Sequence, residues 1–358
     1  MPKDFFYILV RQHEHSSRVS GTIPHHYRRA LPMNRRSFFR SAAAGLLVLG
    51  SRAGASALPR VAVVYMNASV SDIANYRYDK AFTRGLRERG LEDGRNIVIV
   101  RRSAEGQYDR LPRLMQELVS ASVDVIVTTG VRAAWRATQT IPIVAVQSDG
   151  LVELGAVASL GKPGGNVTGL TGGVDLVEMA AKRLQLLHEA VPSASRVAVL
   201  GYELRTLLAS SGLSLESAGR ALGQAVVWAH ARTPQDFKAA FATIEKERAD
   251  ALYVEAQSAT YRHVSDIVNL AAKLKLPSIY ESREGPEQGG LMSYGSDVEE
   301  LFSRAANFVD RILKGAKPGD LPMEQPTRFE LVLNRAAAKT LGINFPPTLL
   351  LRADAFVG

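Results

Sequence analysis

The chain has 358 residues, of which 46% are hydrophobic and 22% are charged. This length is typical of two domains of about 150 residues each, and the hydrophobic fraction excludes an intrinsically disordered protein. The sequence contains no cysteine, which excludes disulfides, zinc–thiolate sites, iron–sulfur clusters and a cysteine nucleophile. The formal net charge of +9 would on its own suggest nucleic acid or an anionic membrane as a partner.

The positive charge is concentrated in the first 57 residues, which carry nine basic residues against two acidic ones. From Met33 this segment reads MNRRSFFRSAAAGLLVLGSRAGASA, with a twin arginine, an apolar run at 42–50 and a small-residue cleavage site at Ala55-Ser56-Ala57. That layout predicts a cleaved export signal, and residues 34–40 resemble the twin-arginine translocation consensus. The apolar run is too short for a membrane anchor, which needs about 20 residues. We therefore expect a periplasmic protein that the twin-arginine translocase exports.

Residues 1–32 show neither a helical nor a strand period, which favours a true start at Met33. A DNA-binding arm is the alternative interpretation of the leader arginines, but no helix-turn-helix pattern accompanies them. Without the leader, 35 basic residues stand against 33 acidic ones, a net charge of +2. We therefore expect no nucleic-acid partner for the mature chain.

From Leu58 onward, short β-branched runs alternate with amphipathic stretches. The expected strands are Arg60–Tyr65, Asn96–Val100, Val123–Thr128, Ile141–Val146, Arg196–Leu200, Ala225–Ala229, Ala251–Glu255, Ser278–Tyr280 and Phe329–Leu333. The expected helices are Tyr78–Arg89, Arg110–Ala121, Val131–Thr138, Leu151–Leu160, Leu176–Ala190, Leu204–Leu222, Gln235–Arg248, His263–Leu274, Val298–Lys314 and Arg335–Leu341. Such alternation predicts an α/β fold with parallel sheets that carry helices on both faces.

The alternation breaks once, at Lys162-Pro163-Gly164-Gly165-Asn166, and then begins again. Two consecutive series predict two doubly wound lobes joined by a hinge, with a tail that could cross back between them. We expect a leader at 1–57, a first lobe at 58–165 plus about 291–325, and a second lobe at 166–290 plus about 326–358.

Motifs for bond chemistry are missing from the sequence. It has no P-loop, no G-x-G-x-x-G after the first strand, no G-x-S-x-G and no H-E-x-x-H. The three histidines beyond the leader, His188, His230 and His263, fall where structural roles are expected. We therefore expect no catalytic residues, no metal and no cofactor, and hence a protein that is not an enzyme.

The predicted architecture offers a cleft instead, because ligands of open parallel sheets bind outside the carboxyl ends of the strands. Polar residues and small residues with free amides follow several expected strands, and Asp149, Glu203 or Glu255 could pair with an ammonium group. The candidate ligand-binding residues at these strand ends are Asn67, Ala68, Ser69, Thr129, Gly130, Ser148, Asp149, Tyr202, Glu255 and Tyr280.

Several segments, in the same order, resemble the ABC transporter substrate-binding protein family of the tryptophan/tyrosine-binding type. Together they cover essentially all of residues 58–358. They are Glu105-Gly106-Gln107-Tyr108-Asp109-Arg110-Leu111-Pro112, Pro163-Gly164-Gly165-Asn166-Val167-Thr168-Gly169, Ala181-Lys182-Arg183-Leu184, Leu291-Met292-Ser293-Tyr294-Gly295, Ile312-Leu313-Lys314-Gly315-Ala316-Lys317-Pro318, Phe329-Glu330-Leu331-Val332-Leu333-Asn334, Leu341-Gly342-Ile343-Asn344-Phe345-Pro346-Pro347 and Arg352-Ala353-Asp354.

The resemblance implies a type I periplasmic binding protein, with two lobes, three hinge crossings and a small solute trapped between the lobes. The implied ligand is an amino acid or a related carboxylate, which a monomer would deliver to an ABC permease in the inner membrane. We expect residues 67–69 and Thr129 to hold the anionic end, while Tyr202, Glu255 and Tyr294 close from the other lobe. Asp149 departs from the family's Asp-Pro-Val turn, because it falls one position early. The alternative function is a periplasmic sensor that presents bound solute to a membrane receptor.

Overall fold

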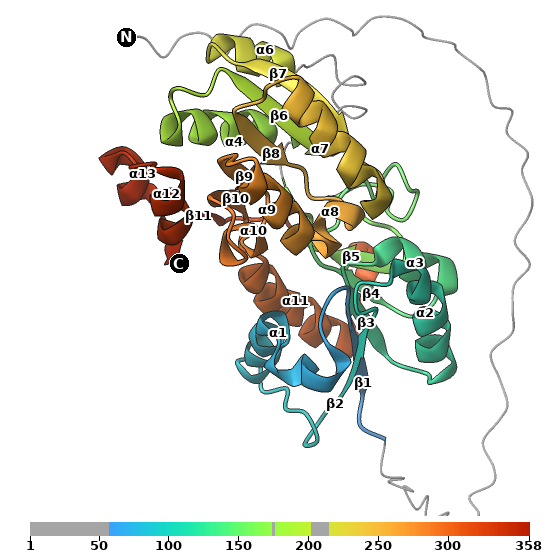
Figure 1. The fold of residues 1–358 in the computed structure, drawn as a ribbon. Coiled ribbons are helices and arrows are strands. Elements are labelled where there is room, and N and C mark those ends of the chain that lie inside the picture. The colour runs from blue at the N-terminus through green and yellow to red at the C-terminus, as the bar shows by residue number, and fades with distance from the viewer. Residues whose placement is uncertain (1–56, 174–175, 202–214) are drawn as a thin grey trace, which may run out of the picture. The chain divides into compact units, whose positions relative to one another are not determined.

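The computed structural model describes residues 57–358 except 174–175 and 202–214, and these residues contain two sheets flanked by helices (Figure 1). The first sheet has the order β2-β1-β3-β4-β5, and the second has the order β12-β11-β10-β9-β8-β6-β7. The first consists of β1 (Arg60–Tyr65), β2 (Val98–Ser103), β3 (Val125–Thr128), β4 (Ile143–Ala145) and β5 (Val167–Gly169). The second consists of β6 (Arg196–Gly201), β7 (Ala225–His230), β8 (Ala251–Val254), β9 (Ser278–Tyr280), β10 (Met292–Ser296), β11 (Phe329–Asn334) and β12 (Ala355–Val357).

Helices cover both faces of each sheet, so the expected α/β class with two lobes is confirmed. The first lobe carries η1 (Val70–Asn75), α1 (Arg77–Arg87), η2 (Tyr108–Arg110), α2 (Leu111–Ser120), α3 (Val131–Ala137), α11 (Val298–Leu313) and η4 (Pro318–Asp320). The second carries α4 (Leu176–Ala190), α6 (Leu215–Ala221), η3 (Pro234–Asp236), α7 (Phe237–Lys246), α8 (Ser258–Arg262), α9 (Val264–Lys273), α10 (Glu284–Glu287), α12 (Arg335–Leu341) and α13 (Pro347–Arg352).

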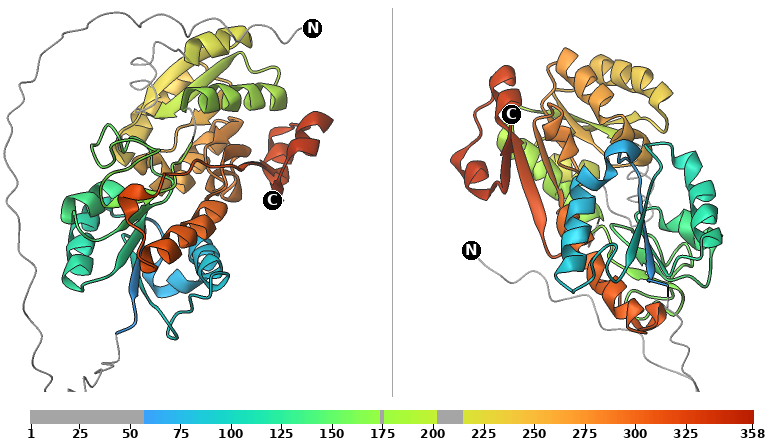
Figure 2. Two further views of the ribbon diagram at one scale, coloured as in Figure 1. Left: turned by 180° about the vertical axis from the view of Figure 1, so that it is seen from behind. Right: turned by 90° about the horizontal axis from the view of Figure 1, so that it is seen from below.

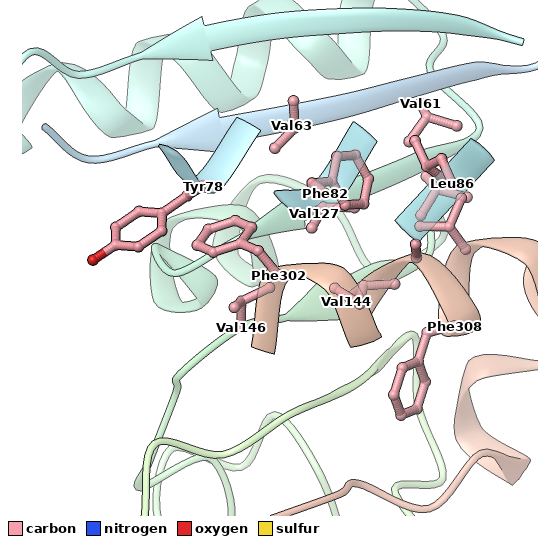
Figure 3. Packing of buried hydrophobic residues seen from close by; sticks show 14 of the residues in the cluster. Val61, Val63, Tyr78, Phe82, Leu86, Val127, Val144, Val146, Phe302 and Phe308 are labelled. Atoms are coloured by element: carbon pink, nitrogen blue, oxygen red, sulfur yellow. The ribbon is translucent and has the colours of Figure 1, made fainter. Parts of the chain in front are cut away.

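The core of the first lobe shows why β1 is apolar at nearly every position. Val61 and Val63 face one helical layer, whereas Ala62 and Val64 face the other, so the strand is buried on both sides. The first layer contains α1 and α11, which lie side by side although they are far apart in sequence (Figure 2). In Figure 3, Phe82 of α1 and Phe302 of α11 pack in this layer.

Pairing in the sheets is parallel except between β10 and β11, which run antiparallel. The expected helix at Leu151–Leu160 is wrong: this segment forms turns. Gly150 and Gly155 adopt φ values of 66° and 76°, outside the right-handed helical region, and so break any helix there. The expected helix at Leu204–Leu222 lies partly outside the described residues, which contain α6.

Two strands lie on the other side of the expected lobe boundaries. β5, at 167–169, pairs with β4 in the first sheet. β10, at 292–296, pairs with β9 and β11 in the second sheet, so the later part of the first lobe begins with α11 rather than at 291. Hydrogen bonding places these strands, and their short sequences give no clue to the sheet they join.

The chain passes between the two sheets three times: after β5, between β10 and α11, and between η4 and β11. These segments are hydrogen bonded to one another. The Thr171 N–H donates to the Glu324 carbonyl at 2.9 Å, and the Asp297 N–H donates to the Arg328 carbonyl at 3.1 Å. The Ser296 hydroxyl donates to the Gly172 carbonyl. The crossings therefore form one bundle rather than three independent linkers.

Within the part of the chain that the structure describes, no helix is both long enough and apolar enough to cross a membrane.

Candidate functional site

A cavity of about 480 Å³ lies where loops of both lobes meet, in the size range of small-molecule sites. In the first sheet it adjoins the carboxyl ends of β1 and β3, the neighbouring strands at which the strand order reverses direction. Ligands of doubly wound sheets bind at this position. Four of the residues expected from sequence line the cavity: Asn67, Thr129, Ser148 and Asp149.

Two of these four residues carry buried polar atoms without a partner among the described residues. They are Oδ1 of Asn67, which follows β1, and Oγ1 of Thr129, which follows β3. A buried oxygen without a hydrogen bond costs about 1–3 kcal/mol, so both atoms suit a polar ligand group. The Asn67 oxygen accepts hydrogen bonds, whereas the Thr129 hydroxyl can donate or accept.

Asp149 lies beside the first hinge crossing. Its Oδ1 accepts a hydrogen bond from the Gly172 N–H at 2.9 Å, and its side chain reaches solvent through the cavity. Enclosure between the lobes raises the pKa of Asp149, and the nearby Glu281 carboxylate adds to this, against the N–H groups of Gly172 and Gly173. A cationic group on a ligand would stabilise the charged carboxylate of Asp149 and so lower its pKa.

Three expected first-lobe residues do not line the cavity: Ala68, Ser69 and Gly130. Ala68 is buried, and its carbonyl accepts from the Ser103 hydroxyl at 2.6 Å. The exposed Ser69 hydroxyl lies 2.9 Å from that of Ser71. Gly130 precedes α3 and donates its N–H to the Thr128 hydroxyl at 2.9 Å.

Within the described part of the second lobe, none of the expected residues lines the cavity. Glu255 is buried against Gly201, and Tyr280 packs against Gly285. The Tyr294 carbonyl accepts from Arg183 Nε at 2.8 Å, and its ring stacks on Phe329. Of these residues, only Arg183 and Phe329, neither of which was expected, line the cavity. Tyr202 and Glu203 lie outside the described residues.

Sequence reasoning missed the aromatic wall of the cavity. Tyr65, Tyr76, Tyr78 and Phe302 form a chain of ring contacts with centroid distances of 4.9–5.4 Å. Tyr78 stacks nearly parallel to Phe302, at an interplanar angle of 9° (Figure 3). Tyr108 and Tyr261 also line the cavity. Tyr65, Tyr78 and Phe302 are almost fully buried in the core of the first lobe, so the partly exposed Tyr76, Tyr108 and Tyr261 provide the ring surface for a ligand. Such surface favours an aromatic or cationic ligand group.

A buried ionic network underlies the second-lobe wall. Arg183 Nη1 lies 3.3 Å from Glu281 Oε1 and 3.1 Å from the Tyr253 hydroxyl, which in turn donates to Glu281 at 2.8 Å. The buried charge of Arg183 is thus compensated. Arg132, at the start of α3, differs: it lines the cavity from an exposed position and makes no ion pair among the described residues.

The family model for ABC transporter substrate binding proteins matches residues 61–357. The chain belongs to the ABC transporter substrate-binding protein family. Members of this family are extracytoplasmic proteins that bind small solutes and associate with an ABC transporter, and they are not enzymes.

Several known proteins resemble this family member. It is 27% identical over 265 residues to a tyrosine-binding protein of Clostridioides difficile, covering 73% of this chain and 75% of the relative. A conserved domain protein from Vibrio cholerae matches with a TM-score of 0.72 and 25% identity, over 83% of this chain and 99% of that one. The ABC domain from Streptococcus pneumonia, solved with L-Trp, matches with a TM-score of 0.71 and 21% identity, over 84% and 100% of the two chains.

Proposed function

We propose that this substrate-binding protein captures an aromatic amino acid, of the tyrosine or tryptophan class, and delivers it to an inner-membrane ABC permease. The observation that carries the proposal is the meeting of an aromatic wall with two unpartnered polar atoms in one cavity. The relatives that bind tyrosine and L-Trp support this choice of ligand.

The polar groups of the cavity fit the charges of an amino acid. Thr129 and Arg132 lie together at the start of α3 and can donate to a carboxylate. Asp149 lies on the cavity wall with a raised pKa, which an ammonium group would lower by favouring the charged carboxylate. In this arrangement, Thr129 keeps the anionic partner expected from sequence.

Asn67 takes a different role from the expected one. Its orphaned atom is an acceptor, so it suits a donor rather than a carboxylate. A tyrosine hydroxyl and a tryptophan indole N–H are both donors at the far end of a ring. We therefore assign Asn67 Oδ1 to the ring end of the ligand and the tyrosine wall to its faces.

Thermal shift measurements on the purified mature chain test the ligand class. At 100 times its Kd, a ligand stabilises the folded form by about 2.7 kcal/mol, which raises the melting midpoint by several degrees. We expect such a rise with L-tyrosine or L-tryptophan. A rise with sugars alone, and none with any amino acid, would overturn the ligand assignment.

Comparing L-tyrosine with L-phenylalanine tests the role of Asn67, since the two ligands differ by one hydroxyl. Asn67→Ala removes a neutral hydrogen bond, worth about 0.5–1.5 kcal/mol, so it should weaken L-tyrosine binding by about 2- to 10-fold. L-phenylalanine affinity should stay unchanged. Asn75→Ala is the matched control, because Asn75 is exposed and its amide bonds only to Asp72 among the described residues. Equal losses for both ligands would refute the assigned contact.

Export through the twin-arginine translocase and action as a monomer complete the proposal. The Arg35-Arg36 pair and the cleavage site at 55–57 support the export route.

A further inference from the structure

A bidentate ion pair joins the two lobes. Arg77 begins α1 in the first lobe, and Glu287 ends α10 in the second, 210 positions later. Arg77 Nη1 lies 2.7 Å from Glu287 Oε1, and Nη2 lies 2.7 Å from Oε2. In the described part of the chain, no other ion pair connects α1 to the second lobe.

The pair lies outside the cavity assigned to the ligand. Arg77 and Glu287 are absent from its walls and instead line a second interlobe cavity of about 480 Å³. Asn67, Tyr76 and Tyr261 separate the two cavities, because they line both. An effect of the ion pair on ligand binding must therefore act through the position of the lobes rather than through ligand contact.

The second-lobe partner, Glu287, is also held by a residue of its own lobe. Arg283 Nε donates to Glu287 Oε1 at 2.9 Å, and Arg283 Nη1 donates to Glu330 at 3.1 Å. Although burial opposes it, pairing with Arg77 and Arg283 lowers the pKa of Glu287 and keeps the carboxylate charged at neutral pH. A pre-oriented carboxylate loses less side-chain freedom on pairing than an ordinary surface partner does.

A hydrogen bond also joins α1 of the first lobe to α10 of the second. The Tyr78 hydroxyl, from α1, donates to Glu284 Oε1 at 2.7 Å, and the Tyr261 hydroxyl donates to the same oxygen at 2.8 Å. Since Tyr78 also lines the ligand cavity, this contact couples the ligand wall to α10. Arg77 directly precedes Tyr78 in α1, and Glu287 follows Glu284 by three positions in α10. The Arg77–Glu287 pair therefore holds together the same two helices as the Tyr78–Glu284 hydrogen bond.

We propose that Arg77 and Glu287 form an interlobe latch that stabilises the closed form and so slows release of the bound ligand. The inference rests on the proposed function, since it treats the chain as a protein that traps a solute between its lobes. An ion pair that forms only when the lobes meet stabilises only the closed state. Both residues are positioning residues and make no contact with the ligand.

Distance measurements by electron paramagnetic resonance test the latch directly. The chain has no cysteine, so spin labels attach only to the introduced residues Gln116→Cys on α2 and Lys238→Cys on α7, both exposed. Without ligand, we expect the short-distance population to be smaller in Arg77→Gln and Glu287→Gln than in the otherwise wild-type protein. Arg113→Gln, which removes an ion pair within α2, is the matched control and should leave the distances unchanged.

Ligand kinetics give the second readout, with L-tyrosine and L-tryptophan as probes. Arg77→Gln should raise koff by about 3- to 10-fold and leave kon within about twofold, because partly buried pairs act mainly after encounter. Arg77→Lys keeps the charge but loses the fork, and so should fall between wild type and Arg77→Gln. Circular dichroism confirms that each variant is folded.

The outcomes separate the latch from the ligand assignment. If neither amino acid binds the wild-type protein, the ligand assignment fails. The spin-label distances measured without ligand still test the latch in that case. Distance distributions that are identical in wild type, Arg77→Gln and Glu287→Gln overturn the latch. Unchanged koff in Arg77→Gln, in a protein that binds either amino acid, overturns it as well.

Discussion

Glu330, on β11, is a single residue whose surroundings oppose its charge. Its pKa is raised from 4.5 to about 7, mainly by burial, with smaller contributions from the negative charges of Asp297, Glu299 and Glu284. The opposing partner is Arg283, at 3.1 Å, which lowers the pKa but does not outweigh the other contributions. The folded chain therefore binds more protons at this site than the unfolded chain between about pH 4.5 and 7. Its contribution to stability falls as the pH rises through that window.

Glu330→Gln should remove the free-energy cost of holding a charged carboxylate at this site, which the folded wild-type chain bears at high pH. At pH 8 we expect the free energy of unfolding to rise by roughly 1–2 kcal/mol, a figure reduced for solvent screening because the site is only partly buried. At pH 4 the gain should vanish, since the wild-type carboxyl is then protonated in both states. Urea denaturation at the two pH values measures the difference, and Glu117→Gln, at an exposed position of α2, serves as control. A variant less stable than wild type at pH 8 would contradict the sign.

At the scale of elements, most buried β-branched runs and amphipathic helices were predictable, the helix expected at Leu151–Leu160 excepted, whereas the strands β5, β10 and β12 were not. β1 was expected at Arg60–Tyr65 and forms there, because a run of five apolar residues suits a strand buried on both faces. β5 and β12 have three residues each, and β10 contains serine and glycine, so their sequences resemble loops. Pairing with existing strands, rather than local preference, determines them.

The candidate site, too, could be predicted from the sequence only in part. The polar residues after β1, β3 and β4 were predictable, because the carboxyl ends of parallel strands meet at one edge. The tyrosine wall was not, since Tyr76 and Tyr78 belong to the start of α1 while Tyr261 comes from α8. Only packing between lobes brings them together. The two tyrosines one residue apart were the one local signal for it.

The first hinge crossing depends on a glycine that leaves room for Asp149. A Cβ at Gly172 would lie 2.5 Å from Asp149 Oδ2, too close for any real contact. Gly172→Ala should displace that carboxylate and weaken its hydrogen bond from the Gly172 N–H; because the carboxylate ends an exposed side chain that can turn away, the cost should be about 1 kcal/mol or less. A lower melting midpoint and weaker amino-acid binding, by thermal shift and calorimetry, are the expected results.

Gly173→Ala is the matched control for the hinge variant, because nothing lies within 4 Å of a Cβ at Gly173. It should leave the melting midpoint and the affinity close to wild type. Equal effects of the two substitutions would show that the hinge responds to lost backbone freedom rather than to the crowding of Asp149.

For the whole molecule, the uneven distribution of charge indicates that the leader serves export and the remainder of the chain binds the ligand. The first 57 residues carry nine basic and two acidic residues, whereas the remainder is nearly neutral at +2. A nearly neutral body has no long-range attraction for polyanions. The basic segment therefore belongs to the proposed export step, and the ligand chemistry belongs to the body.

The leader segment gives a prediction that concerns export. If Arg35 and Arg36 are read by the twin-arginine translocase, Arg35→Lys/Arg36→Lys should abolish the periplasmic form in a Gram-negative host, because the receptor reads that pair and not its charge. Arg52→Lys, which changes a leader arginine after Met33 but outside residues 34–40, is the control and should export normally. Fractionation and mass spectrometry should find a mature chain that begins at Leu58. Normal export of the 35/36 variant would contradict the route, and deletion of residues 2–32 should leave export intact if translation starts at Met33.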